Sequence, residues 1–201
     1  MTKPVYIVAA KRTAIGSFMG ALSGVSATKL GAAAVKGAIQ QSGIDSNAVD
    51  ELLFGNVISA NLGQAPASQV AYYAGLRNST PCTIINKVCA SAMKTVMMGH
   101  QTITNGDNHI VVTGGMESMS QVPHYLPNTR LGTKYGNFEA LDGIVRDGLQ
   151  DVYTRMMMGE AGEMCADKYG ITRQLQDDFC VRSYKNSISA IEQGLFVDEI
   201  S

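Results

Sequence analysis

Short apolar runs rich in β-branched residues alternate along this chain with longer segments whose small and apolar side chains recur at helical spacing. The predicted strands are residues 5–10, 51–58, 83–86 and 109–113, and the predicted helices are residues 29–42, 64–74 and 90–104. Strands that alternate with helices of this length favour a largely parallel sheet covered by helices. The sequence therefore predicts an α/β fold.

The ends of the predicted helices carry recognisable signals. Ser26 is a candidate N-cap of the first helix, and Gly43 and Gly75 stand where the first two helices should stop. In the third helix, a set of large side chains shares one face and is expected to pack in the core: Met93, Val96, Met97, His100 and Ile103.

The pattern changes near Met119. Residues 121–148 have no sustained period and carry Pro123, Pro127 and several glycines, whereas residues 150–169 and 172–193 look helical, with Thr172 as an N-cap. We therefore expect an α/β unit over residues 1–119 and an incomplete, loop-rich helical (lid) domain over residues 120–201.

Composition excludes several classes of function. The net charge is −1, so no global electrostatic footprint for nucleic acid or an anionic membrane is present. The apolar stretches are too short to span a bilayer, and the first residues lead into an apolar run without a visible presequence. The four cysteines form no CxxC pair and no zinc-type spacing, so reduced thiols are expected.

Cys89 is the strongest candidate for chemistry. It lies where a strand-like run gives way to a helical pattern, in the segment Asn86-Lys87-Val88-Cys89-Ala90-Ser91-Ala92-Met93-Lys94. The unpaired N–H groups at a helix start favour a thiolate, which is the nucleophilic form of cysteine. The alternative is an inert core cysteine, and this interpretation is preferred for Cys82, Cys165 and Cys180.

Other residues have weaker signals. Gly114-Gly115 follows a strand but no GxGxxG pattern follows it, so a dinucleotide site is not favoured. Glu117 is a candidate general base, although a structural hydrogen-bonding role is preferred. His100 is expected to be packed on a helix face, and His109 and His124 carry no catalytic motif.

Three segments together resemble the thiolase family, and within it the biosynthetic acetyl-CoA C-acetyltransferases (acetoacetyl-CoA thiolases). They are residues 5–18, the Cys89 segment, and Gly114-Gly115-Met116-Glu117-Ser118-Met119-Ser120, and the likeness extends through Gln64-Ala65-Pro66, Asp147-Gly148-Leu149 and Met158-Gly159. The resemblance implies the N-terminal part of a five-layered αβαβα fold with a mixed, mostly parallel sheet.

The resemblance also implies a reaction. Cys89 would be acylated by a CoA thioester, and a Claisen condensation of two acetyl-CoA molecules would give acetoacetyl-CoA and CoA, with thiolysis as the reverse. Leu149, Met158 and Tyr184 would contact substrate, and Tyr184 would also lie near a possible potassium ion; no other cofactor is implied. Members of the family are homo-oligomers, so a dimer or tetramer is expected.

Some features depart from the family pattern. Ala92, Ala14 and Met157 stand where relatives usually have Gly, Pro and His, and the methyl of Ala92 could crowd the nucleophile turn. The chain resembles only the first half of a thiolase and lacks the histidine and second cysteine of the other half. Residues 1–201 alone are therefore expected to be inactive, unless a continuation or a partner chain supplies these groups.

Two other functions are kept as alternatives. The chain could be a non-catalytic thiolase-like subunit that binds acyl-CoA or scaffolds a complex, or another condensing enzyme such as a β-ketoacyl synthase. The Gly-Gly-Met-Glu-Ser-Met-Ser segment favours thiolase over the latter. The expected compartment is the mitochondrial matrix if a presequence has been removed, and the cytoplasm otherwise.

Overall fold

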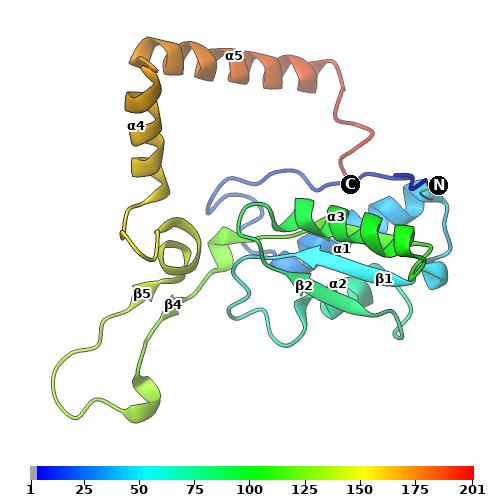
Figure 1. Ribbon diagram of the computed structural model, residues 1–201, viewed down its shortest axis with the longest axis horizontal. Coiled ribbons are helices and arrows are strands. Elements are labelled where there is room, and N and C mark those ends of the chain that lie inside the picture. Colours follow the sequence, from blue (N-terminus) through cyan, green and yellow to red (C-terminus); the bar gives the residue numbers. More distant parts are fainter. Residues whose placement is uncertain (1–3) are drawn as a thin grey trace.

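A three-stranded parallel sheet forms the centre of the molecule. The computed structural model describes residues 4–201. Strands β1 (Glu51–Gly55), β2 (Cys82–Ile85) and β3 (Val111–Gly115) lie in the order β2-β1-β3, with β1 parallel to both neighbours (Figure 1). Leu52 is opposite Cys82 on one side and Val112 on the other. The predicted α/β class with a mostly parallel sheet is confirmed.

Helices cover the two faces of this sheet. Helices α1 (Ala27–Ser42) and α2 (Pro66–Ala74) pack with the buried side chains of Leu52 and Phe54 in one hydrophobic core. Gly55, which follows Phe54 and so faces the other way, lies against the first turn of helix α3 (Ser91–Asn105). The core is therefore a three-layered α/β/α arrangement, and α3 brings its N-terminus to the end of β1.

Capping residues set the helix ends, as the sequence predicts. The Ser26 hydroxyl accepts from the Lys29 N–H, and Gly43, Gly75 and Gly106 adopt left-handed conformations just after α1, α2 and α3. A glycine reaches this conformation at little cost because it has no Cβ.

The packing face predicted for α3 is wrong at most of its positions: His100 is exposed, and Ile103 is half-buried. Met93, Val96 and Met97 are 65%, 41% and 51% exposed, whereas the buried side of the helix consists of Ser91, Thr95 and Gly99. A Cβ added at Gly99 would lie 2.7 Å from Thr113 Cγ2 in β3. The small face therefore packs because it lets the helix approach the sheet closely, whereas Met93, Val96 and Met97 stay exposed.

The first predicted strand is also not formed. Residues 5–10 have no ladder partner, and Tyr6, Ile7 and Val8 are 76%, 83% and 63% exposed. This segment lines a cavity of about 290 Å³ together with Val111, Val112 and Thr113 of β3. An apolar run becomes a strand only where a neighbour pairs its backbone groups, and a cavity separates this run from β3. Residues 1–3 lie outside the described part of the chain.

After β3 the chain leaves the sheet. Strands β4 (His124–Tyr125) and β5 (Leu141–Asp142) form a two-stranded antiparallel hairpin, followed by a π-helical turn (Val145–Leu149) and helices α4 (Met158–Tyr169) and α5 (Arg173–Glu192). Short 3₁₀ helices are Ser46–Ala48, Met119–Gln121 and Thr129–Leu131. The domain boundary expected near Met119 stays a prediction.

The helix predicted over 150–169 begins later than expected. Asp151 accepts hydrogen bonds from the Tyr153 and Thr154 N–H groups and from the Thr154 hydroxyl. These contacts, the Thr154 N–H first, lower the pKa of Asp151. An aspartate that bonds its own following backbone forms a turn in competition with a helix, and α4 starts only at Met158.

The helix predicted from Thr172 is confirmed, because Thr172 caps α5 by accepting from the Leu175 N–H.

Helices α4 and α5 stand apart from the sheet and its covering helices, and the chain after α5 returns to the segment around Arg12 (Figure 1). Cys165 on α4 and Cys180 on α5 are exposed, so the interpretation of these thiols as packed is wrong. No helix among residues 4–201 has the length and apolar character needed to cross a bilayer.

Candidate functional site

The carboxyl ends of the three parallel strands meet at one edge of the sheet and bring several polar side chains together. Asn56 follows β1, Asn86 follows β2 and Glu117 follows β3. Cys89 lies three residues after Asn86, just before α3 begins. Open parallel sheets commonly bind ligands outside this edge, so the fold places Cys89 where a substrate could reach it.

Cys89 is held in a tight turn and is exposed. Val88, immediately before it, has φ +48°, a left-handed conformation that a β-branched residue rarely adopts. The turn is closed by the Ser91 N–H, which donates to the Val88 carbonyl at 3.0 Å, and by the Lys87 N–H, which donates to the Ser91 hydroxyl at 2.9 Å. The predicted position of Cys89 at the start of a helix is confirmed.

A cavity of about 390 Å³ lies over Cys89. Its walls come from the ends of β1 and β3, from the first turn of α3 and from the turn before α4: Gly55, Asn56, Val57, Ile58, Val88, Cys89, Ser91, Ala92, Gly115, Met116, Glu117, Met119, Gly148 and Leu149. Most of this wall is apolar, and small-molecule pockets generally combine an apolar wall with a few polar groups.

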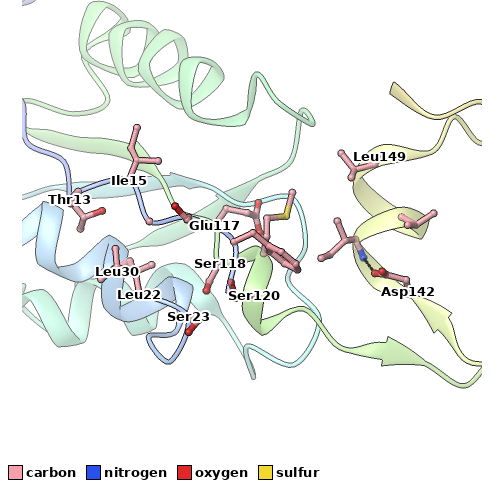
Figure 2. A pocket seen from close by; sticks show the side chains of 17 residues that line it. Thr13, Ile15, Leu22, Ser23, Leu30, Glu117, Ser118, Ser120, Asp142 and Leu149 are labelled. Carbon is pink, nitrogen blue, oxygen red and sulfur yellow. Dashed lines mark hydrogen bonds between the residues drawn. The ribbon is translucent and has the colours of Figure 1, made fainter. Parts of the chain in front are cut away.

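A second cavity, of about 610 Å³, adjoins the first. Figure 2 shows Thr13, Leu22 and Leu30 on one side of it and Asp142 and Leu149 on the other. Both cavities share Glu117, Met119 and Leu149 as lining residues. Together the two cavities connect Cys89 with the segment 142–149.

Glu117 accepts three hydrogen bonds at the boundary between these cavities. Its Oε2 receives the Val57 N–H at 2.9 Å, and its Oε1 receives the Asn56 amide at 2.9 Å and the Ile58 N–H at 3.3 Å. Burial raises the pKa of Glu117, and these donors partly offset the effect. Because both oxygens are already engaged, the preferred hydrogen-bonding role agrees with the geometry better than a role as general base.

Leu149 is carried by a turn that a tyrosine holds in place. The Tyr125 hydroxyl on β4 donates to Asp147 Oδ2 at 2.6 Å, two residues before Leu149. Burial, and next the Asp147 carboxylate, raise the pKa of Tyr125 to about 12. The hydroxyl therefore stays protonated at neutral pH and fixes the position of the turn opposite Cys89.

The sequence of residues 5–201 matches the family described as "Thiolase, N-terminal domain". The chain belongs to the thiolase family. It is 52% identical over 196 residues to an acetyl-CoA acetyltransferase of Schizosaccharomyces pombe. The aligned region covers 98% of this chain and 50% of that protein. It is 49% identical over 195 residues to the cytosolic acetyl-CoA acetyltransferase ERG10 of Gibberella zeae, covering 97% and 49%. The chain spans about half the length of these thiolases.

Two residues that the resemblance placed at the substrate are not beside Cys89. Met158 at the start of α4 and Tyr184 on α5 are 58% and 69% exposed, and neither lines the cavity over Cys89. Within residues 4–201 no group of three His, Cys, Asp or Glu residues could hold a metal ion. The substrate roles of Leu149, Met158 and Tyr184, and the potassium role of Tyr184, stay predictions.

The departures from the thiolase pattern have visible consequences at one position. The Ala92 methyl lies over Gly115, where an added Cβ would stand 2.8 Å from the Ala92 Cβ. The crowding expected at Ala92 is thus absorbed by a glycine in β3. Ala14 lines the larger cavity, and the Met157 N–H donates to Glu160 at 2.6 Å as α4 begins.

Of the remaining cysteines, only Cys82 agrees with the packed interpretation. Its thiol is half-buried on β2 and donates to the Thr80 carbonyl at 3.2 Å, and burial raises its pKa. Sequence reasoning missed Asn56, which is 1% exposed and bonds Glu117 from 61 positions away. No periodicity or spacing could have indicated that contact, whereas Asn86 and Ser91 belong to the segment already singled out around Cys89.

Proposed function

We propose that Cys89 is the acyl-accepting nucleophile of an acetyl-CoA C-acetyltransferase. The observation that carries the proposal is an exposed thiol at the start of α3, on the floor of a cavity with a mostly apolar wall. The thiolate would attack the thioester carbonyl carbon of acetyl-CoA, and collapse of the tetrahedral intermediate would release CoA as its thiolate. This exchange replaces one thioester with another, so it is close to isoenergetic and suits cysteine.

The second half-reaction would form a carbon–carbon bond. A base removes a proton from the methyl group of a second acetyl-CoA, and the resulting carbanion attacks the acyl-cysteine carbonyl. Acetoacetyl-CoA leaves and the Cys89 thiolate is regenerated. General acid–base assistance of this kind contributes about 10²- to 10⁴-fold in rate. Glu117 is a poor candidate for the base because its two oxygens accept three hydrogen bonds.

The base and the acid are therefore expected outside residues 1–201, in the other half of the thiolase fold. This proposal agrees with the chain spanning about half the length of its relatives and with the exposed apolar face of α3. Thiolase turnover by residues 1–201 alone would contradict it.

The test is acylation of Cys89 itself. The full-length polypeptide that contains these residues is incubated with acetyl-CoA, and peptide mass spectrometry should find an added mass of about 42 Da, one acetyl group, on Cys89. Cys89→Ser should abolish the rapid adduct, whereas Cys180→Ser, which removes another exposed thiol, should leave it unchanged. Absence of the adduct from the wild-type protein would contradict the proposal.

A non-catalytic acyl-CoA-binding or scaffold subunit is the second candidate, favoured because Glu117, the acidic residue that lines the Cys89 cavity, has both of its oxygens engaged by hydrogen bonds. It predicts binding of acetyl-CoA without acylation. The acetyl-CoA incubation separates the two functions once an alkylation step is added, because a binding subunit would protect Cys89 from iodoacetamide but acquire no acetyl group.

Acetyl-CoA, acetoacetyl-CoA and CoA are proposed as ligands because the relatives are named acetyl-CoA acetyltransferases. The homo-oligomer, dimer or tetramer, and the compartment, mitochondrial matrix or cytoplasm, stay predictions.

A further inference from the structure

A continuous chain of hydrogen bonds connects Glu117 to the backbone beside Cys89. Glu117 Oε2 receives the Val57 N–H at 2.9 Å, and the Val57 carbonyl receives the Asn86 amide at 3.1 Å. The Asn86 side-chain oxygen then receives the Val88 N–H at 3.0 Å. The connection runs across the ends of β3, β1 and β2 in turn and ends one residue before the nucleophile.

The last link of this chain acts on a strained residue. A β-branched residue in the left-handed region is strained and persists only where its surroundings enforce that conformation. Val88 has φ +48°, and both of its backbone groups are engaged, the N–H by Asn86 and the carbonyl by Ser91. Asn86 is exposed, so its side chain is free to rotate into solvent unless a second contact holds it. The hydrogen bond to the Val57 carbonyl supplies that contact and keeps the Asn86 oxygen bonded to the Val88 N–H.

The first link is fixed from several sides. Asn56 is 1% exposed and donates to both the Met116 carbonyl, at 3.2 Å, and Glu117. The Ser59 hydroxyl donates to the Asn56 side-chain oxygen. Glu117 thus holds residues 56–58 in one position, and that position presents the Val57 carbonyl to Asn86.

We propose that Glu117 is a positioning residue, which holds the Cys89 turn in its reactive geometry through Val57 and Asn86. The proposal rests on the proposed function only in taking Cys89 as the reactive thiol. It assigns Glu117 no contact with substrate and no proton transfer. The proposal has one distinguishing consequence. Substitutions at Glu117 and Asn86 should affect Cys89 through the same route, although the two side chains are connected only through Val57.

The test measures alkylation of Cys89 by iodoacetamide in the full-length protein, with peptide mass spectrometry resolving each cysteine. Glu117→Gln replaces one acceptor oxygen with an amide donor, and Asn86→Ala removes the link to Val88. Each variant should slow alkylation of Cys89 about five- to tenfold, a size typical of coupled contacts. Cys165 and Cys180, exposed on α4 and α5, are internal references whose rates should not change.

The double variant decides between a chain of contacts and two separate effects. If the contacts form one chain, Glu117→Gln combined with Asn86→Ala should react about as slowly as either single variant. Multiplied effects, unchanged rates at Cys89, or equal slowing at all exposed cysteines would overturn the proposal. Alkylation of Cys89 needs no acetyl-CoA. The alkylation rates therefore test this proposal even if acetyl-CoA does not acetylate Cys89.

One further variant keeps the test independent of how well Glu117→Gln folds. In Asn86→Ser the hydroxyl can still accept from the Val88 N–H, as serine does in similar turns, but it is too short to reach the Val57 carbonyl. It should slow alkylation of Cys89 by a similar factor with an unchanged melting temperature. A wild-type alkylation rate in Asn86→Ser would show that the contact with Val57, and so with Glu117, has no effect on the reactivity of Cys89, and would overturn the proposal.

Discussion

At the scale of single residues, the position of Cys89 depends on Gly55, which has no side chain and so leaves room for the first turn of α3. A Cβ added at Gly55 would lie 2.7 Å from the Ala92 nitrogen and 2.8 Å from the Ser91 carbonyl carbon. These are backbone atoms of the first turn of α3 and cannot rotate away. Gly55→Ala is therefore expected to destabilise the protein by about 1–3 kcal/mol, as overpacking does, and to slow acylation of Cys89. Chemical denaturation and the acetyl-CoA assay measure these two effects.

Gly162→Ala is the matched control for this substitution. Gly162 lies within α4, and a Cβ added there would meet no neighbouring segment within 4 Å. Alanine favours a helix over glycine by about 1 kcal/mol, so stability should stay equal or rise and acylation should not change. Equal stability of Gly55→Ala and wild type would show that α3 can shift away from β1 at little cost.

Residue-level prediction from the sequence succeeded where the signal was local. The location of Cys89 at a helix start follows from the residues around it. The contacts of Asn56 and Asn86 could not be found, because they join segments 61 and 29 positions apart, and their geometry exists only once three strands lie side by side.

At the scale of elements, the junction between β1 and β3 should respond to acid. Asp50 precedes β1 and accepts from the N–H groups of His109 at 2.7 Å and Ile110 at 3.0 Å, just before β3. The Ile110 N–H first, and then the His109 N–H, lower the pKa of Asp50. As pH falls, the unfolded chain therefore takes up this proton before the folded chain does. The stabilisation is present above the unfolded pKa and is lost as pH falls through the folded pKa.

Asp50→Asn should flatten the fall in melting temperature below about pH 5, because it removes this titration while keeping a side-chain oxygen as acceptor. The exposed Asp107, just beyond α3, provides the control: Asp107→Asn should keep the wild-type slope. Identical pH profiles for Asp50→Asn and wild type would show that Asp50 contributes nothing to the acid sensitivity of the fold.

Elements with their own end signals were predicted within a few residues, as Ser26, Gly43 and Thr172 show. Errors arose where the formation or packing of an element depends on a neighbouring element. The run 5–10 is apolar enough for a strand but meets no backbone partner, and the large side chains of Met93, Val96 and Met97 on α3 stay exposed. A helical period shows which residues share a face, but it does not show which of two faces packs.

At the scale of the whole molecule, the three-layered core leaves apolar surface uncovered on the side of α3. Met93, Val96 and Met97 are exposed together on this helix, beside the turn that carries Cys89. The thiolase resemblance implies a second α/β half packed against the first, and such a half would cover this face. The same contact would bring the acid and base proposed to lie outside residues 1–201 close to Cys89.

Met97→Glu tests whether this face is covered in the complete protein. Burying a methionine side chain contributes about 1.5–3 kcal/mol, and an unpaired buried carboxylate opposes packing further. We therefore expect the full-length variant to melt at a lower temperature and to lose at least about tenfold of its thiolase turnover, since the two halves no longer align. Ala33→Glu, which adds the same charge at an exposed position of α1 on the opposite side of the sheet, should behave like wild type. Wild-type melting and turnover in Met97→Glu would show that α3 faces solvent in the functional protein and that the acid and base reach Cys89 from another side.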